Sequence, residues 1–167
     1  MNLNFEQFFL DKSGLNFSTA SLDKIIQGLT KPIVFTNGVF DILHKGHLSY
    51  LIESKKLGAS LIVGINSNES SKKLNKKFNR PINDERDRAE LVSSLKPVDL
   101  CIIFNEETPE NLIKKLHPQI YTKGNDYNFN KLPYHKTLAH LKIKTYFIPL
   151  IKNKSSTSII KKIKDAI

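Results

Sequence analysis

Residues 35–51 read FTNGVFDILHKGHLSYL and place two histidines, His44 and His47, around Gly46. The apolar run PIVFT (32–36) is typical of a buried strand, and the residues after the histidines have a helical pattern. At the start of a helix, this spacing puts both imidazoles on one face, and the glycine allows close approach of the backbone. Because the first amides of a helix lack partners within it, this turn predicts a site for an anion such as a polyphosphate.

Apolar runs and helical patterns alternate along the rest of the chain. Thr108 and Pro109 are expected to begin the helix at 108–117, and Gly58 to end the helix at 47–58. Alternating strands and helices form βαβ units, so we predict an α/β, doubly wound (Rossmann-like) fold with a five-stranded parallel sheet. The other predicted strands are 61–66, 100–104, 119–124 and 144–150, and the other predicted helices are 83–95, 132–142 and 156–167.

The chain is expected to form one domain over residues 30–167, preceded by an N-terminal helical extension. Two short helical patterns, near residues 3–10 and 20–29, predict that residues 1–29 pack on this core as an addition. No internal repeat and no low-complexity linker argues for a further division.

Composition narrows the class of protein. The 167 residues are 40% hydrophobic with a mean hydropathy of −0.31, which is typical of a globular domain. No apolar run approaches the ~18 residues of a membrane span, and the first ten residues lack the basic segment of a signal peptide. The one cysteine, Cys101, predicts a buried strand thiol rather than a disulfide. We therefore expect a cytoplasmic protein that does not bind membranes.

Charge gives the first positive indication of a partner. Lysine and arginine number 26 against 16 acidic residues, so the net charge is +10 and the chain favours anionic partners. A basic nucleic-acid-binding protein is the competing class, but no aromatic RNA-binding pattern or other reader motif is present. A small phosphorylated molecule accounts for the charge without a nucleic-acid partner.

Polar residues gather where the predicted strands end, which is the edge at which doubly wound sheets bind ligands. Neither GxxxxGK[ST] nor GxGxxG occurs, so a P-loop and a dinucleotide site are both excluded. A zinc site needs at least one more ligand, and only Asp41 is near the histidines in sequence, so we predict no metal held by the protein alone. The polar segments are TNGVFDILHKGH (36–47), NSNESSKKLNKK (66–77), KGNDY (123–127) and KNKSSTS (152–158).

The first of these segments closely resembles the signature of the cytidylyltransferase-like nucleotidyltransferases. Over residues 30–165, the combination with RPINDERDRAELVSSL, KGNDY and SSTSIIKKI is similar to the stand-alone D-glycero-β-D-manno-heptose 1-phosphate adenylyltransferases of lipopolysaccharide synthesis. The resemblance implies transfer of AMP from ATP to a sugar 1-phosphate, giving ADP-heptose and pyrophosphate, with Mg²⁺ and a homodimer. GND and NSN stand where that family often has GGD and NSD, and neither change removes an essential charge.

Three other activities share parts of this pattern. Another phospho-sugar adenylyltransferase and a glycerol- or ethanolamine-phosphate cytidylyltransferase both remain open, because the residues alone do not reveal which base is used. A class I aminoacyl-tRNA synthetase also carries an HxGH-type signature, but this chain lacks the length for a tRNA-binding region.

The resemblance assigns roles to individual positions. The catalytic residues are expected to be His44, His47 and Lys76, with Lys77 as the rival for the loop lysine. Arg80 and Arg88 are each expected either to pack a helix, to contact a dimer partner or to bind phosphate. The expected nucleotide-binding residues are Thr36, Asn37, Gly38, Val39, Phe40, Gly46, Lys123, Ser155, Ser156 and Thr157, and the expected substrate-binding residues are Asp41, Arg80, Gly124 and Asp126.

Overall fold

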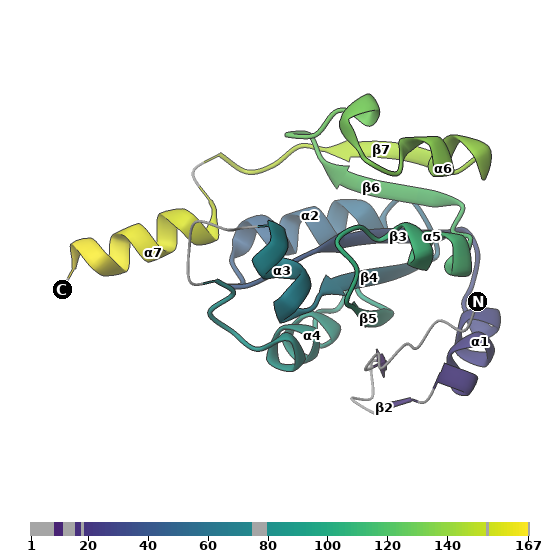
Figure 1. The fold of residues 1–167 in the computed structure, drawn as a ribbon, viewed down its shortest axis with the longest axis horizontal. Helices are drawn as coiled ribbons and strands as arrows, with labels where there is room; N and C mark the ends of the chain where they lie inside the picture. Colours follow the sequence, from purple (N-terminus) through teal and green to yellow (C-terminus); the bar gives the residue numbers. More distant parts are fainter. Residues whose placement is uncertain (1–8, 12–15, 18, 75–79, 153, 167) are drawn as a thin grey trace.

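The computed structural model describes residues 9–11, 16–17, 19–74, 80–152 and 154–166 (Figure 1). Within them, the chain forms a seven-stranded sheet in the order β2-β1-β5-β4-β3-β6-β7. The five strands predicted from the sequence are all parallel, which confirms the doubly wound α/β fold. They are β3 (Ile33–Gly38), β4 (Ser60–Asn66), β5 (Leu100–Phe104), β6 (Ile120–Gly124) and β7 (Lys144–Ile148).

Strand β3 lies where the direction of winding reverses. It pairs with β4 on one side and with β6 on the other, so that Phe35 lies beside both Ile62 and Tyr121. The chain moves outward from β3 through β4 to β5, and then returns to β6 and β7 on the other side. Ligands of such sheets bind at the carboxyl ends of the strands at this reversal. The histidine turn follows β3 directly, and therefore lies at that point.

The helices cover both faces of the sheet. Helices α2 (Lys45–Lys55), α4 (Glu85–Ser93), α5 (Glu110–Leu116), α6 (His135–His140) and α7 (Ser156–Asp165) correspond to the predicted ones. Figure 1 shows α7 projecting away from the body of the domain. No helix of the described residues is long and apolar enough to cross a membrane.

Several local predictions need correction. The N-cap of α5 is Pro109 and not Thr108, and α2 ends at the cap Lys56, before Gly58. Gly58 is required for space, because a Cβ there would lie 2.5 Å from the carbonyl oxygen of Pro32. Helix α3 (Asn68–Leu74) and a short 3₁₀ turn (Phe129–Lys131) were not predicted, since neither segment has an apolar stripe of helical period.

The N-terminal extension is only partly helical. Residues 1–8 lie outside the described residues, and Phe9–Asp11 form strand β1 where a helix near 3–10 was expected. Strand β1 pairs antiparallel with β5 and with β2 (Asn16–Phe17). An open edge of β5 offers unpaired backbone groups, and their pairing outweighs a local helical pattern. The second expected helix is present as α1 (Thr19–Gly28).

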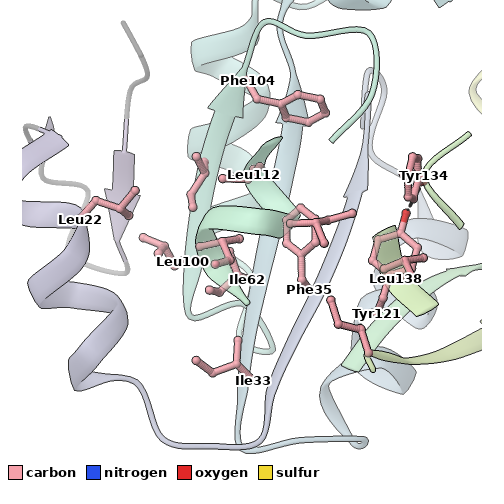
Figure 2. Packing of buried hydrophobic residues seen from close by; sticks show 14 of the residues in the cluster. Leu22, Ile33, Phe35, Ile62, Leu100, Phe104, Leu112, Tyr121, Tyr134 and Leu138 are labelled. Carbon is pink, nitrogen blue, oxygen red and sulfur yellow. Dashed lines mark hydrogen bonds between the residues drawn. The ribbon is translucent and has the colours of Figure 1, made fainter. Parts of the chain in front are cut away.

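The core has two layers, because successive side chains of a strand point to opposite faces. One layer packs Phe35, Ile62 and Tyr121 against α1, α5 and α6, and it includes Leu22 of the extension (Figure 2). The other packs alternate residues of the same strands against α2 and α4. Cys101 belongs to the second layer, and burial raises the pKa of its thiol, as expected of a structural cysteine.

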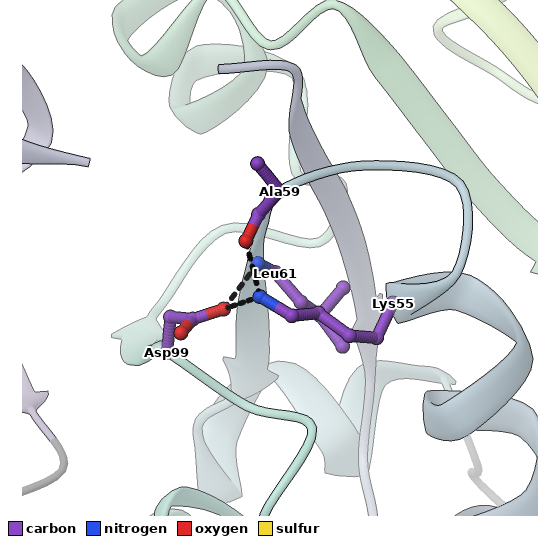
Figure 3. A network of polar contacts seen from close by, with 4 residues as sticks. All are labelled: Lys55, Ala59, Leu61 and Asp99. Atoms are coloured by element: carbon purple, nitrogen blue, oxygen red, sulfur yellow. Dashed lines mark hydrogen bonds and ion pairs between the residues drawn. The ribbon is translucent and has the colours of Figure 1, made fainter. Parts of the chain in front are cut away.

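The C-terminal end of α2 is tied to the start of β4. The ammonium of Lys55 donates to the carboxylate of Asp99 and, at 2.5 Å, to the carbonyl oxygen of Ala59 (Figure 3). The same carboxylate oxygen accepts from the backbone amide of Leu61 at 2.7 Å. This network anchors one end of α2, whose other end carries the histidines.

Candidate functional site

A cavity of about 270 Å³ opens at the carboxyl ends of β3 and β6. Three segments far apart in sequence form its wall: the end of β3 with its loop and the first turns of α2, the end of β6, and the segment leading into α7. Its lining residues are Asn37, Gly38, Val39, Phe40, His44, Gly46, His47, Tyr50, Lys123, Gly124, Asp126, Leu150, Ile151, Lys154, Ser155 and Ser156. The structure therefore brings most of the predicted nucleotide-binding residues together in one place.

His44 is the N-cap of α2. Its Nδ1 accepts a hydrogen bond from the backbone amide of Gly46 at 3.0 Å, which fixes the ring and puts the proton of the neutral imidazole on Nε2. The ring stacks on that of His47, with the centroids 3.9 Å apart. A Cβ on Gly46 would lie 2.8 Å from two atoms of the His44 ring. The glycine thus makes room chiefly for the imidazole.

Both histidines are held in the neutral form. The pKa of His47 is lowered to about 4, chiefly by burial and in addition by the neighbouring His44, against an opposing effect of Asp41. Burial and the nearby Lys154 also lower the pKa of His44. Near neutral pH the two rings therefore offer N–H groups rather than full charges. The positive charge at this cavity comes from Lys123 and Lys154.

Lys123 extends from β6 across to β3. Its ammonium donates to the backbone oxygen of Asn37 at 2.9 Å and lies over the Tyr127 ring, 5.1 Å from the centroid. Burial lowers the pKa of Lys123 to about 8, and Asp126 opposes that shift. A Cβ on Gly124 would lie 2.5 Å from a carboxylate oxygen of Asp126, so only glycine leaves this carboxylate in place.

A second cavity of about 180 Å³ adjoins the first and shares Val39, Phe40, His47 and Ser156 with it. Asp41, Ser71, Arg80 and Pro81 line only the second. The Oδ1 of Asp41 accepts from the backbone amides of Ile82 and Asn83, whereas its buried Oδ2 has no partner among the described residues. The predicted substrate-binding residues are therefore divided, with Asp41 and Arg80 here and Gly124 and Asp126 in the larger cavity.

Arg88 is completely buried and reaches neither cavity. Its guanidinium donates to the backbone oxygens of Val39 (2.5 Å), Asn66 (2.8 Å) and Asn83 (3.1 Å), and to the Oδ1 of Asn68 (2.9 Å). Of the roles considered for it, the structural one fits. It joins the loop after β3, the end of β4 and the segment before α4 into one support beneath the two cavities.

Besides Asp41, three of the predicted site residues do not line the larger cavity, and two lysines cannot be placed. The hydroxyl of Thr36 is buried, 2.5 Å from that of Tyr50, and donates to the backbone oxygen of Thr122. Arg80, a wall of the second cavity, donates to Thr157 at 3.4 Å, and Thr157 lines neither cavity. Lys76 and Lys77 lie outside the described residues.

Sequence reasoning missed four lining residues: Tyr50, Leu150, Ile151 and Lys154. The sequence positions of two of these residues, Tyr50 and Lys154, could have identified them as lining residues. Tyr50 follows His47 by three residues, and so shares its helix face, and Lys154 directly precedes the cap of α7. The apolar pair belongs to the irregular segment between β7 and α7, for which the sequence has no periodic pattern.

The profile of the family described as cytidylyltransferase-like matches residues 35–163, so the chain belongs to that family. A D-beta-D-heptose 1-phosphate adenylyltransferase of Bordetella bronchiseptica is 42% identical over 136 residues, covering 81% of this chain and 84% of that protein. The bifunctional protein HldE of Campylobacter fetus is 46% identical over 155 residues. That match covers 92% of this chain but only 33% of HldE, so the chain spans about a third of that relative.

Solved structures agree with this assignment. A lipopolysaccharide core biosynthesis protein of Thermoplasma volcanium superposes with a TM-score of 0.60 at 37% identity, covering 73% of this chain and 98% of that one. A pantothenate synthetase of Thermus thermophilus superposes with a TM-score of 0.59 over 87% of this chain and 68% of its own. At 17% identity, this second likeness shows the shared fold alone.

Proposed function

We propose that the chain transfers AMP from ATP to D-glycero-β-D-manno-heptose 1-phosphate, producing ADP-heptose and pyrophosphate. The observation that carries the proposal is the pair of stacked histidines at the N-terminus of α2, which faces a cavity that also contains Lys123 and Lys154. The name of the Bordetella relative, which matches this chain over most of both lengths, supports the choice of acceptor.

The reaction needs alignment and charge stabilisation more than acid–base chemistry. An oxygen of the sugar phosphate attacks the α-phosphorus of ATP, a new P–O bond forms, and the bond to the departing pyrophosphate breaks. The attacking oxygen is already an anion, so no general base is required. His44 and His47 are proposed to donate N–H groups to the phosphate oxygens as charge moves onto the leaving group. Lys123 would act beside them as a fixed positive charge.

The N-terminus of α7 is suited to the outer phosphates of ATP. Ser155 caps this helix by accepting from the amide of Ser158 at 3.1 Å, while Ser158 accepts in return from the amide of Ser155 at 3.2 Å. Ser155 and Ser156 also line the larger cavity. A capped helix start that lines a cavity is a favourable position for anionic groups. We propose that it binds the phosphates that leave as pyrophosphate, together with Thr157.

The two cavities suggest separate places for the two substrates. We propose that the nucleotide occupies the larger cavity, where Gly38, Gly124 and the apolar Leu150 and Ile151 leave space for it. The sugar 1-phosphate would enter the smaller cavity, with Arg80 near its phosphate and the free carboxylate oxygen of Asp41 near a hydroxyl. His47 lies in the wall between them, where the bond is to form.

A divalent metal is part of this proposal as a companion of ATP. Among the described residues, no three His, Cys, Asp or Glu side chains are grouped to hold an ion. One carboxylate, Asp126, lines the larger cavity, and this fits Mg²⁺, which commonly binds through substrate phosphates and one or two carboxylates. When bound there, Mg²⁺ would offset the negative charge of the phosphates.

Three further elements of the proposal rest on the family resemblance. Lys76, or its neighbour Lys77, would bind phosphate. The chain would act in the cytoplasm as a homodimer. Light scattering on the purified chain tests the dimer, and a Lys76→Ala variant with unchanged kinetics would transfer the loop role to Lys77.

A product assay tests the activity itself. The chain is incubated with Mg²⁺, with ATP or CTP as donor, and with heptose 1-phosphate (each anomer), glycerol 3-phosphate or phosphoethanolamine as acceptor. We expect ADP-heptose by mass spectrometry, with the β anomer and ATP preferred. Faster formation of CDP-glycerol would replace the proposed substrates with others of the same family. Absence of pyrophosphate release with every pair would overturn the proposed activity.

A further inference from the structure

We propose that the side-chain amide of Asn37 donates a hydrogen bond to a phosphate group of the nucleotide. We further propose that Tyr121 and Tyr134 are positioning residues that hold the amide in the required orientation. This rests on the proposed function only in that a nucleotide occupies the larger cavity. It names the group through which Asn37, one of the expected nucleotide-binding residues, would contact the nucleotide.

The orientation of the Asn37 amide follows from its neighbours. Its Oδ1 lies 2.7 Å from the hydroxyl of Tyr121 and 3.3 Å from the ammonium of Lys123. An ammonium can only donate, so the atom facing it has to be the oxygen of the amide. The Nδ2 group, with two N–H donors, is then left without a partner among the described residues. Asn37 lines the larger cavity, where a ligand can take up this donor.

Tyr121 in turn is directed by Tyr134. The two hydroxyls are 2.6 Å apart, and the rings meet edge to face with centroids 5.6 Å apart. Because Tyr121 gives its proton to Asn37, the proton between the two phenols has to come from Tyr134. Burial raises the pKa of both hydroxyls, so both remain protonated donors. In this chain of hydrogen bonds, Tyr134 therefore donates to Tyr121, and Tyr121 donates to Asn37.

Lys123 explains why a phosphate is the expected ligand. Its ammonium lies beside Asn37 and bonds both the Oδ1 and the backbone oxygen of that residue. The free N–H groups of the amide and the positive charge thus occur at the same part of the cavity. An anionic oxygen can accept hydrogen bonds from the amide N–H groups and is attracted by the ammonium of Lys123. A phosphate group provides such oxygens.

Binding of adenosine, AMP and ATP with Mg²⁺, measured by calorimetry, tests the contact in wild type and in Asn37→Asp and Asn37→Ser. Asp retains the acceptor toward Tyr121 and Lys123 but removes the N–H donors, and Ser provides a smaller neutral change. We expect AMP and ATP to bind roughly 10- to 100-fold more weakly to both variants, with adenosine within twofold of wild type. AMP and ATP affinities within twofold of wild type, or an equal loss for adenosine, would overturn the phosphate contact.

Tyrosine variants test the positioning role. In Tyr121→Phe the amide loses its fixed donor, and ATP should bind about tenfold more weakly. In Tyr134→Phe the Tyr121 hydroxyl still reaches Asn37, so the loss should stay below threefold. Both variants should lose thermal stability, because each removes the hydrogen bond between the two buried hydroxyls.

A merely structural role would make the losses of affinity follow the losses of stability. Equal loss of ATP affinity in Tyr121→Phe and Tyr134→Phe would therefore overturn the assigned roles. Tyr146→Phe is the matched control, because Tyr146 lies on β7 with 42% of its surface exposed. It should leave ATP affinity unchanged. None of these measurements uses the acceptor, so they remain valid if heptose 1-phosphate proves to be the wrong acceptor.

Discussion

The imidazole rings of His44 and His47 stack 3.9 Å apart at an interplanar angle of 18°. Each ring buries one face of the other. Protonation of one ring makes protonation of the other less favourable, because two positive charges would then lie side by side. The stack therefore presents two neutral donors in a fixed geometry. It also makes the two residues unequal, since His44 is anchored to Gly46 whereas the Nδ1 of His47 has no partner among the described residues.

Replacing either histidine by alanine should reduce kcat by about 10²- to 10³-fold, as is typical when a donor to a developing negative charge is removed. The circular dichroism spectrum should remain that of wild type. His140→Ala serves as the control, because that ring is exposed on α6, and its turnover should not change. Turnover near the wild-type level in His47→Ala at saturating ATP would remove that residue from the reaction.

The low pKa of His47 predicts a dependence of stability on pH. Its folded value of about 4 lies below the ordinary 6.5, so between these values the folded protein binds fewer protons than the unfolded chain. The free energy of unfolding should therefore fall as pH decreases from 6.5 to 4, by up to about 3 kcal/mol from this residue. Urea unfolding of wild type and His47→Gln across this range isolates the effect. Parallel curves for the two proteins would contradict the prediction.

Gly46→Ala should displace the His44 ring, because the new Cβ would lie 2.8 Å from its Cε1 and Nδ1. We expect at least a tenfold loss of turnover with a much smaller change in melting temperature, since the displaced side chain lies at the cavity rather than in the core. Gly28→Ala is the matched control, because nothing lies within 4 Å of a Cβ at that position. Wild-type turnover in Gly46→Ala would show that the anchored ring position is not needed.

Arg88→Met should destabilise the protein by about 3 kcal/mol or more, because the carbonyl groups that the buried guanidinium satisfies lose their donor. Arg88→Lys should recover only part of this, since one ammonium cannot reach three backbone segments in a planar arrangement. The same substitution at the exposed Arg86, Arg86→Met, provides the comparison. Equal midpoints of urea unfolding for Arg88→Met and Arg86→Met would contradict the structural role.

The sequence predicted what depends on periodicity and on local motifs. The five apolar runs became the five parallel strands, and the histidine turn lies at the carboxyl end of the central strand, as that pattern required. The edge strand β1 could not be predicted, because its partner β5 is about ninety residues away in the chain. Tertiary pairing decided its conformation against the local helical signal.

The sequence predicted which residues lie at the site better than it predicted what each of them does there. Lys123 and Ser156 were expected at the cavity and line it, whereas Thr36 proved to be a buried support. The function of Arg88 could not be read from the sequence, because its partners are backbone oxygens from three segments. Every residue has a backbone oxygen, so the residue types at these positions do not reveal the contacts.

Pairing between β3 and β6 has a consequence for how the protein folds. Val34 and Ile120 are neighbours in the sheet. Asn37 contacts Tyr121 and Lys123, which are 84 and 86 positions further along the chain. Closing so long a loop has a large entropic cost, and it precedes any gain from the contacts that it permits. Strands β3 and β4 are much closer in sequence and can associate earlier. We therefore expect the ability to bind nucleotide to return late in refolding, after most of the sheet has formed.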